Sequence, residues 1–376
     1  MTDPSKKTDG SDPLPRVRAL DGVRGLAILL VMIHHFTLIP HGPLADDALH
    51  AVSRLGWTGV DLFFVLSGYL ITSILIEYKG DGKYFSAFYA RRVLRILPLY
   101  YVVLLLVLVI LPPFVDVGRV HGSSIWYWLH ASNIRFALFG FNHRNLNIAW
   151  SLAIEEQFYL FWPLVVHLVP REKMARASLA VFGFSVACRF ALELAGAPWI
   201  TTYVATPCRL DGLALGGFLA SLPAARLQSS GKTALRVLAG AALVSAAVIA
   251  VSRSLAMERR FAPTVGFAAL AVMWGAVLVL AISTPSVTRA FSSRPLVTLG
   301  KYSYALYLFH PTVADLVKTR LFGVEAWPRV GRSLLLGQLL FHAIAGGITL
   351  ALAWVSWRAL EDPILRLKRH FRYARM

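Results

Sequence analysis

The stretch RGLAILLVMIHHFTLIP, residues 24–40, has the composition of an apolar helix and carries two adjacent histidines, His34 and His35. Comparable apolar runs recur along the 376-residue chain, in which hydrophobic residues make up 57% and charged residues only 15%. A soluble domain carries more charge, whereas this composition is typical of a polytopic helical membrane protein. The first run lacks a small-residue cleavage site, so we expect a retained membrane helix rather than a removed signal peptide.

The apolar runs predict an all-α fold, a polytopic transmembrane helix bundle of about ten helices. We expect one membrane domain at residues 16–360, between a polar N-terminal tail at residues 1–15 and a basic C-terminal tail at residues 361–376. The aromatic side chains of a long loop at about residues 114–147 suit an interfacial position. The candidate spans lie at about residues 25–39, 58–77, 97–113, 148–168, 177–195, 203–222, 237–252, 263–283, 302–320 and 333–357.

The net charge of +18 does not indicate a nucleic-acid partner, because the 38 Lys and Arg residues gather at the ends of the apolar runs. If the N-terminus is cytoplasmic, most of them fall in cytoplasmic segments, as the positive-inside rule requires. We therefore expect both termini in the cytoplasm. Cys188 and Cys208 lie in apolar runs without CxxC or Cys/His ligand spacing, so neither a metal site nor a disulfide framework is expected.

Arg24 and His35 are the first pair of candidate functional residues. Ionisable residues inside a span are costly, so they usually face a cavity or a partner, or else form a buried hydrogen bond between helices. The two residues are eleven positions apart, which places them within roughly 20° on one helix face and about 16 Å apart along the axis. His34 points about 80° away from that face. We therefore expect His35 to be the working histidine, near mid-membrane, and His34 to pack.

A cluster of cations lies in FYARRVLRILPLYY, residues 88–101, just before the third candidate span. Spacings of three and four residues place Arg95 beside both Arg91 and Arg92 on a helical surface. Three guanidinium groups held together suit a phosphate-rich ligand, through bidentate hydrogen bonds. The alternative is ordinary anchoring of the helix end at the cytoplasmic face.

Carboxylates occur at two further places in the apolar runs. Asp61 begins the second candidate span, and Glu155 and Glu156 lie about two turns into the fourth. Consecutive carboxylates on a helix point about 100° apart, so at most one of the glutamates shares a given cavity. Such a group either orients an imidazole or packs as a structural, protonated acid.

The remaining polar candidates have a supporting role in this prediction. The glycines in TPCRLDGLALGG (206–217) and LGKYSYALYLFHPTV (299–313) suggest close helix packing, and Ser67 lacks the frame of a nucleophile elbow. The supporting candidates are Arg18, Asp21, Arg209, Asp211, Tyr302, Ser303 and His310.

Six stretches, in order, resemble the acyltransferase-3 family of bacterial integral membrane O-acyltransferases. They are RALDGVRGLAILLVMIHHF, GVDLFFVLSGYLI, RRVLRILPLYY, WSLAIEEQFYLFWP, RLDGLALG and GKYSYALYLFHP, within about residues 16–360. The family pattern of a basic residue, ten intervening positions and a histidine falls on Arg24 and His35. Its Arg-x-x-Arg pattern falls on Arg92 and Arg95, which the resemblance implies help to hold acyl-CoA.

The resemblance implies an O-acyltransferase, most often an O-acetyltransferase, in the bacterial cytoplasmic (inner) membrane. Acetyl-CoA or another acyl-CoA would be the co-substrate, the acceptor an extracytoplasmic or lipid-linked carbohydrate, and no metal is expected. We expect the CoA phosphates at Arg24, Arg91, Arg92 and Arg95.

Acyl transfer to a hydroxyl needs a base that removes the alcohol proton. We expect His35 to be that base, because a neutral imidazole can accept a proton near neutral pH. Glu155, Glu156 or Asp61 is expected to orient it.

Three alternatives remain at this stage. A transporter or flippase also uses buried ionisable residues, although inverted repeats and Gly/Pro-broken helix pairs are not evident. The sequence HPTVAD gives His310 and Asp315 the His-x4-Asp spacing of glycerolipid acyltransferases, but without an FPEGT-like stretch. A structural or receptor role would leave Arg24, His35 and the arginine cluster without a purpose.

Overall fold

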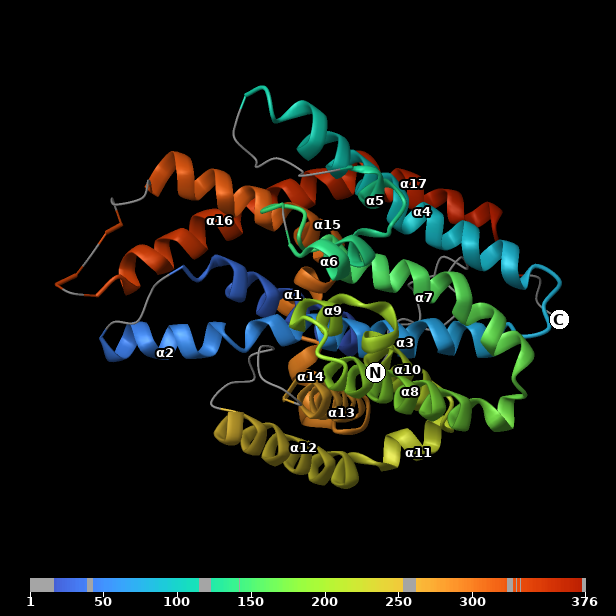
Figure 1. Cartoon of the computed structure of the whole chain (residues 1–376). Helices are drawn as coiled ribbons and strands as arrows, with labels where there is room; N and C mark the ends of the chain where they lie inside the picture. Colours follow the sequence, from blue (N-terminus) through green and yellow to red (C-terminus); the bar gives the residue numbers. More distant parts are fainter. Residues whose placement is uncertain are drawn as a thin grey trace.

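The computed structural model describes residues 17–38, 43–114, 123–141, 143–252, 262–322, 327–328, 330–331 and 333–373. The polar tail predicted at residues 1–15 lies outside these ranges. Within them every regular element is helical, apart from one antiparallel bridge between Val330 and Ser333. The long helices form a bundle (Figure 1), which confirms the all-α prediction.

The helices of the first half of the chain are α1 (Arg18–Phe36), α2 (Leu44–Ser53), α3 (Gly59–Glu77), α4 (Tyr84–Leu105), α5 (Ile125–Trp128), α6 (Ser132–Phe139), α7 (Ala149–Leu168) and α8 (Met174–Leu194). Those of the second half are α9 (Trp199–Val204), α10 (Thr206–Ala220), α11 (Ala224–Ser229), α12 (Gly231–Ser252), α13 (Ala262–Ser283), α14 (Pro285–Phe291), α15 (Arg294–Val317), α16 (Leu335–Ser356) and α17 (Asp362–Arg366). Short 3-10 or π segments are η1 (Gly56–Thr58), η2 (Leu106–Ile110), η3 (Arg171–Lys173), η4 (Lys318–Phe322), η5 (Trp357–Glu361) and η6 (Leu367–His370).

All ten predicted spans fall on helices, namely α1, α3, α4, α7, α8, α10, α12, α13, α15 and α16. In the described ranges seven helical stretches are long and apolar enough to cross a membrane, those that contain α1, α3, α4, α8, α12, α13 and α16. The chain is thus a multi-pass membrane protein. The other three predicted spans, α7, α10 and α15, contain ionisable residues discussed below. The count of ten and the cytoplasmic placement of both termini stay predictions.

Two regions differ from the expected boundaries. The helix α4 begins at Tyr84 rather than near residue 97, because the Ala, Leu and Arg residues before the apolar run are good helix formers. The arginine cluster therefore lies within this helix, in agreement with the helical surface expected for it. The loop expected at the interface forms α5 and α6 and packs against the bundle, where Tyr127 and Phe136 are fully buried. The Tyr100 hydroxyl donates to the carbonyl of Tyr127 at 2.8 Å.

The helix α1 lies in the middle of the bundle and packs against α15, α16 and α3 (Figure 1). Its contact with α15 is a close approach of two backbones. A Cβ atom on Gly300 of α15 would lie 1.8 Å from the carbonyl oxygen of Asp21, and one on Gly25 would lie 2.0 Å from that of Leu296. Only glycine fits at these two positions, as in the small-residue interfaces of membrane helices.

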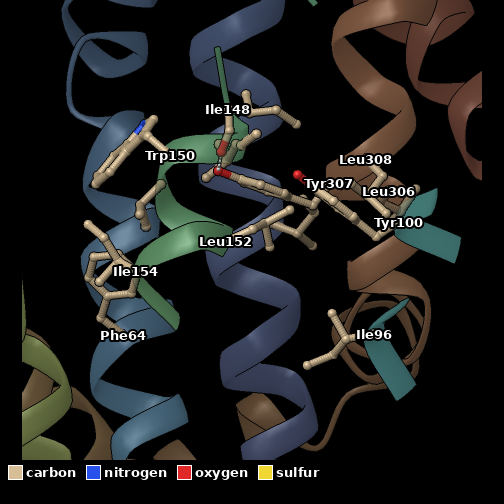
Figure 2. Packing of buried hydrophobic residues seen from close by; sticks show 14 of the residues in the cluster. Phe64, Ile96, Tyr100, Ile148, Trp150, Leu152, Ile154, Leu306, Tyr307 and Leu308 are labelled. Carbon is tan, nitrogen blue, oxygen red and sulfur yellow. Dashed lines mark hydrogen bonds between the residues drawn. The ribbon is translucent and has the colours of Figure 1, made fainter. Parts of the chain in front are cut away.

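The apolar core fills the space between α4, α7 and α15. Figure 2 shows Tyr100, Leu152, Leu306, Tyr307 and Leu308 packed together there. The Tyr307 hydroxyl is 2.6 Å from the hydroxyl of Ser151 and donates to the carbonyl of Ile148 at 3.2 Å. The buried hydroxyl groups of Tyr307 and Ser151 therefore have partners, as burial requires.

Two buried ion pairs join three of the helices. Arg209 of α10 contacts Asp61 of α3 at 2.6 Å, and Arg189 of α8 contacts Asp211 of α10 at 2.7 Å. The Arg209 guanidinium also lies 4.1 Å from the centroid of the Phe267 ring. All four charged side chains are nearly or fully inaccessible. Arg209 and Asp211, predicted as supporting residues, thus hold α3, α8 and α10 together.

Replacing Gly300 by Ala should weaken the contact between α1 and α15. The added methyl group cannot fit against the Asp21 carbonyl, so the helices must separate, at a cost of about 1–3 kcal/mol. The matched control is Gly240→Ala on α12, where a Cβ atom meets nothing within 4 Å. Thermal unfolding of the purified protein in detergent should show a lower Tm for the first variant only. Equal Tm values would contradict the close approach.

Replacing Asp61 by Asn should destabilise the fold, because it leaves the Arg209 guanidinium buried without its counter-charge. Breaking a buried pair in this way costs about 3–5 kcal/mol. The exposed pair of Arg366 and Asp362, also 2.6 Å apart, provides the control, and Arg366→Ala should change stability by less than about 0.5 kcal/mol. An Asp61→Asn protein with unchanged Tm but lost turnover would instead assign Asp61 a chemical role.

Candidate active site

His35 lies in the last turn of α1, and its side chain is exposed. Its Nδ1 atom is 3.0 Å from the carbonyl oxygen of Val31 and 3.2 Å from Nε2 of His310 on α15. His310 is fully buried behind it, and its own Nδ1 is 3.1 Å from the carbonyl oxygen of Leu306. The structure therefore brings together an accessible imidazole and a buried one from helices far apart in the sequence.

His34 occupies a different environment from its neighbour. Its Nδ1 atom is 2.9 Å from the carbonyl oxygen of Ser53, at the end of α2, and the side chain is half-buried. This contact ties α1 to α2, in agreement with the expected packing role. Because α1 is continuous over both Arg24 and His35, the common face predicted for these two residues is retained.

Arginines from α1 and α4 converge at the other end of that face. The Arg24 side chain is 26% exposed, forms an ion pair with Asp21 at 3.8 Å, and interacts electrostatically with Arg95 and Tyr159. The Arg92 guanidinium lies over the Tyr159 ring, 5.8 Å from its centroid. Three of the four predicted phosphate-binding residues are thus gathered and partly accessible. Like charges at this spacing favour a bound anion.

Arg91, the fourth, has a different environment. Its side chain is buried, and Nη1 donates to the carbonyl oxygen of Lys368 in η6 at 3.4 Å. Beside it, Tyr373 stacks on Tyr78 with ring centroids 3.9 Å apart. Burial raises the pKa of Tyr373 to about 12, so its hydroxyl stays protonated at neutral pH. Arg91 therefore anchors the C-terminal segment over the start of α4.

The two glutamates of α7 lie near the arginines and are half-buried. Glu155 interacts with the hydroxyl groups of Ser67 and Tyr159, which also hydrogen-bond to each other. Ser67 was expected only to pack, and Tyr159 was not predicted at all. A signal for Tyr159 existed, because it follows Glu155 by four residues and so shares its helix face.

For the expectation that Glu155, Glu156 or Asp61 orients His35, the structure shows no hydrogen bond between His35 and any of the three in the described residues. In the described part of the chain, the hydrogen-bond partners of the His35 ring are the Val31 carbonyl and His310. Asp61 is bound to Arg209, and Glu155 interacts with Ser67 and Tyr159. A second imidazole therefore takes the place that sequence reasoning gave to a carboxylate.

The remaining predicted residues are placed as follows by the helices that carry them. Ser303 is buried, and the Tyr302 ring lies 5.9 Å from that of Trp357. Arg18 is exposed at the start of α1. Asp315 forms an ion pair with Arg144 at 2.9 Å, while both ring nitrogens of His310 have other partners. In the described residues His310 and Asp315 thus have different partners and are not hydrogen-bonded to each other.

The chain is similar over nearly its whole length to known O-acetyltransferases. The peptidoglycan O-acetyltransferase OatA of Listeria monocytogenes is 29% identical over 373 residues, which cover 93% of this chain and 56% of that protein. A putative O-acetyltransferase of Staphylococcus aureus (strain COL) is 31% identical over 384 residues, covering 95% of this chain and 59% of the relative. The chain thus spans a little over half the length of these curated relatives. No solved structure matches it.

The family model Acyl_transf_3, described as an acyltransferase domain, matches residues 17–358. That range runs from the residue before α1 to the first turn of η5 and includes every helix that contributes to the site. The match covers nearly the whole described chain and agrees with the six sequence stretches that resembled the same family. This protein belongs to the Acyl_transf_3 family of acyltransferase domains.

Proposed function

We propose that this protein is a membrane O-acetyltransferase that uses acetyl-CoA, or another acyl-CoA, from the cytoplasm. The acceptor is a hydroxyl group of an extracytoplasmic or lipid-linked carbohydrate, and the membrane is the bacterial inner membrane. The names of the relatives, which include a peptidoglycan O-acetyltransferase, support this reaction class. The observation that carries it is the exposed His35 at one end of the α1 face whose other end meets the arginine cluster.

The donor binds first at the arginine end. Arg24, Arg92 and Arg95 hold the CoA phosphates, since guanidinium groups bind phosphate oxygens bidentately. The spacing of about 16 Å between Arg24 and His35 along α1 then has a purpose, because the extended pantetheine arm carries the thioester away from the phosphates. Glu155 and Tyr159 line the path beside Arg92 and help to position the donor.

The transfer takes place at His35. The imidazole removes the proton of the acceptor hydroxyl as the oxygen attacks the thioester carbonyl carbon. The tetrahedral intermediate then collapses, the C–S bond breaks, and the thiolate of CoA leaves. The proton held on His35 passes to that thiolate, so that free CoA and the ester are formed and the neutral imidazole is restored.

Replacing His35 by Ala should abolish acetyl transfer while the protein still inserts in the membrane. A positioned general base contributes about 10²- to 10⁴-fold, so the rate should fall by that order. The measurement is release of free CoA from labelled acetyl-CoA by inverted membrane vesicles, with label followed into glycan and lipid fractions. His34→Ala is the matched control, because it removes the adjacent imidazole, whose contact is with Ser53. Normal activity of the His35→Ala protein would refute the assignment of His35 as the general base.

Replacing both Arg92 and Arg95 by Ala should raise the KM for acetyl-CoA more than it lowers kcat. Each lost hydrogen bond to a charged phosphate weakens binding by about 1.5–3 kcal/mol, or roughly 10- to 100-fold. The Lys/Lys variant should be intermediate, because it keeps the charge but not the bidentate geometry. The proposal fails on this point if the Ala/Ala protein keeps the KM of the unaltered protein, or if Arg366→Ala on the exposed surface raises it as much.

A further inference from the structure

The contact between His35 and His310 is asymmetric. His35 is exposed, whereas His310 is fully buried on the far side of the contact. The nitrogen atoms that meet are Nδ1 of His35 and Nε2 of His310, 3.2 Å apart. Only one of these two atoms can carry the proton of a hydrogen bond between neutral rings.

Two backbone carbonyls decide which of these two nitrogen atoms carries the proton. The Leu306 oxygen lies 3.1 Å from Nδ1 of His310, and the Val31 oxygen lies 3.0 Å from Nδ1 of His35. A carbonyl oxygen is only an acceptor, so both Nδ1 atoms are protonated in neutral rings. Nε2 of His310 is then unprotonated, and the single Nδ1–H of His35 is shared between this nitrogen and the Val31 oxygen in a three-centre hydrogen bond. If Nε2 of His310 carried the proton instead, both Nδ1 atoms would be unprotonated. Each would then face a carbonyl oxygen, Val31 for His35 and Leu306 for His310, with no proton between the two acceptors.

We propose that His310 is the positioning residue of the reaction: together with the Val31 carbonyl, it holds the exposed His35 ring in the orientation and tautomer whose free base is Nε2. The inference rests on the proposed function, in which His35 is the base. It adds the identity of the reacting nitrogen and the residue that fixes the His35 ring relative to a second helix. Selection of a histidine tautomer by a partner on the other ring nitrogen is a general device of catalytic and metal-binding histidines.

His310 also stabilises the charged intermediate. When Nε2 of His35 takes the acceptor proton, Nδ1–H donates a charge-assisted hydrogen bond to the unprotonated Nε2 of His310. The ionisable groups whose rings face the pair are His34, 5.1 Å from His35, and Tyr307, 5.7 Å from His310. A neutral acceptor is suited to this site, because a buried carboxylate would be an uncompensated charge whenever His35 is neutral.

The Val31 carbonyl does not make His310 redundant. Val31 belongs to the same helix as His35, so that contact fixes the ring only relative to α1. His310 belongs to α15 and fixes the ring relative to the rest of the bundle. A partner 275 positions away in the sequence thereby couples helix packing to the orientation of the base.

Two amide variants of His310 test this role. The side-chain oxygen of Gln occupies the position of Nε2 and can accept from His35, whereas the amide of Asn ends near the position of Nδ1 and cannot reach it. His310→Gln should keep kcat within a few-fold. His310→Asn should lower kcat on the order of 10- to 100-fold without changing the KM for acetyl-CoA. Equal kcat values for the two variants, whether normal or low, would overturn the inference.

Nitrogen-15 NMR of the unaltered, histidine-labelled protein in lipid bilayers at neutral pH gives a second test that does not need turnover. Signals of His35 are assigned by their loss in His35→Gln. We expect a protonated Nδ1 and an unprotonated Nε2, and a protonated Nε2 on His35 would refute the inference. Failure of the proposed function can be distinguished from failure of this inference. If the proposed function is wrong, the unaltered protein transfers no label, whichever tautomer His35 has.

Discussion

The contact between α1 and α15 is the constraint on which the site depends. Gly25 and Gly300 let the two backbones approach until each glycine faces a carbonyl of the other helix. This approach places His310 3.2 Å from His35, a distance at which an interposed water or side chain has no room. A wider crossing would leave both imidazoles in place on their own helices but would break the bond between them.

Two groups of charges in the membrane domain have different surroundings. Asp61, Arg209, Arg189 and Asp211 are inaccessible and paired at 2.6 or 2.7 Å, which is how a bundle tolerates buried charge. Arg24, Arg92 and Arg95 are partly accessible and lie close to one another. Such an arrangement is costly for the protein alone and favourable once an anionic ligand is bound. The fold thus separates charges that are paired inside the bundle from charges that are partly accessible.

The two ends of α1 also differ in chemistry. Its first half carries the Arg24 guanidinium, and its last turn carries the His35 imidazole, which contacts the imidazole of His310. A single rigid helix sets the distance between the two functions, so the spacing does not depend on loops. The family match from residue 17 to residue 358 covers this helix together with its partners α4, α7 and α15.

The sequence by itself determined the helices and the residues that share a helix face. All ten apolar runs form helices, because hydropathy and helix periodicity are properties of neighbouring residues. For the same reason Arg24 and His35 were predicted as one functional pair on α1. Contacts between helices were out of reach, because they depend on how close and at what rotation two helices pack.

Only the tertiary structure decided which residues are partners. It paired His35 with His310 across 275 positions, whereas the sequence led us to expect a carboxylate beside His35. It paired Asp61, one of those expected carboxylates, with Arg209 across 148 positions. It also placed Tyr159 and Ser67 among the charged residues and buried Arg91 under the C-terminal segment. Local patterns assign a side chain to a face, but the neighbour on the other side of that face is set by packing of the whole bundle.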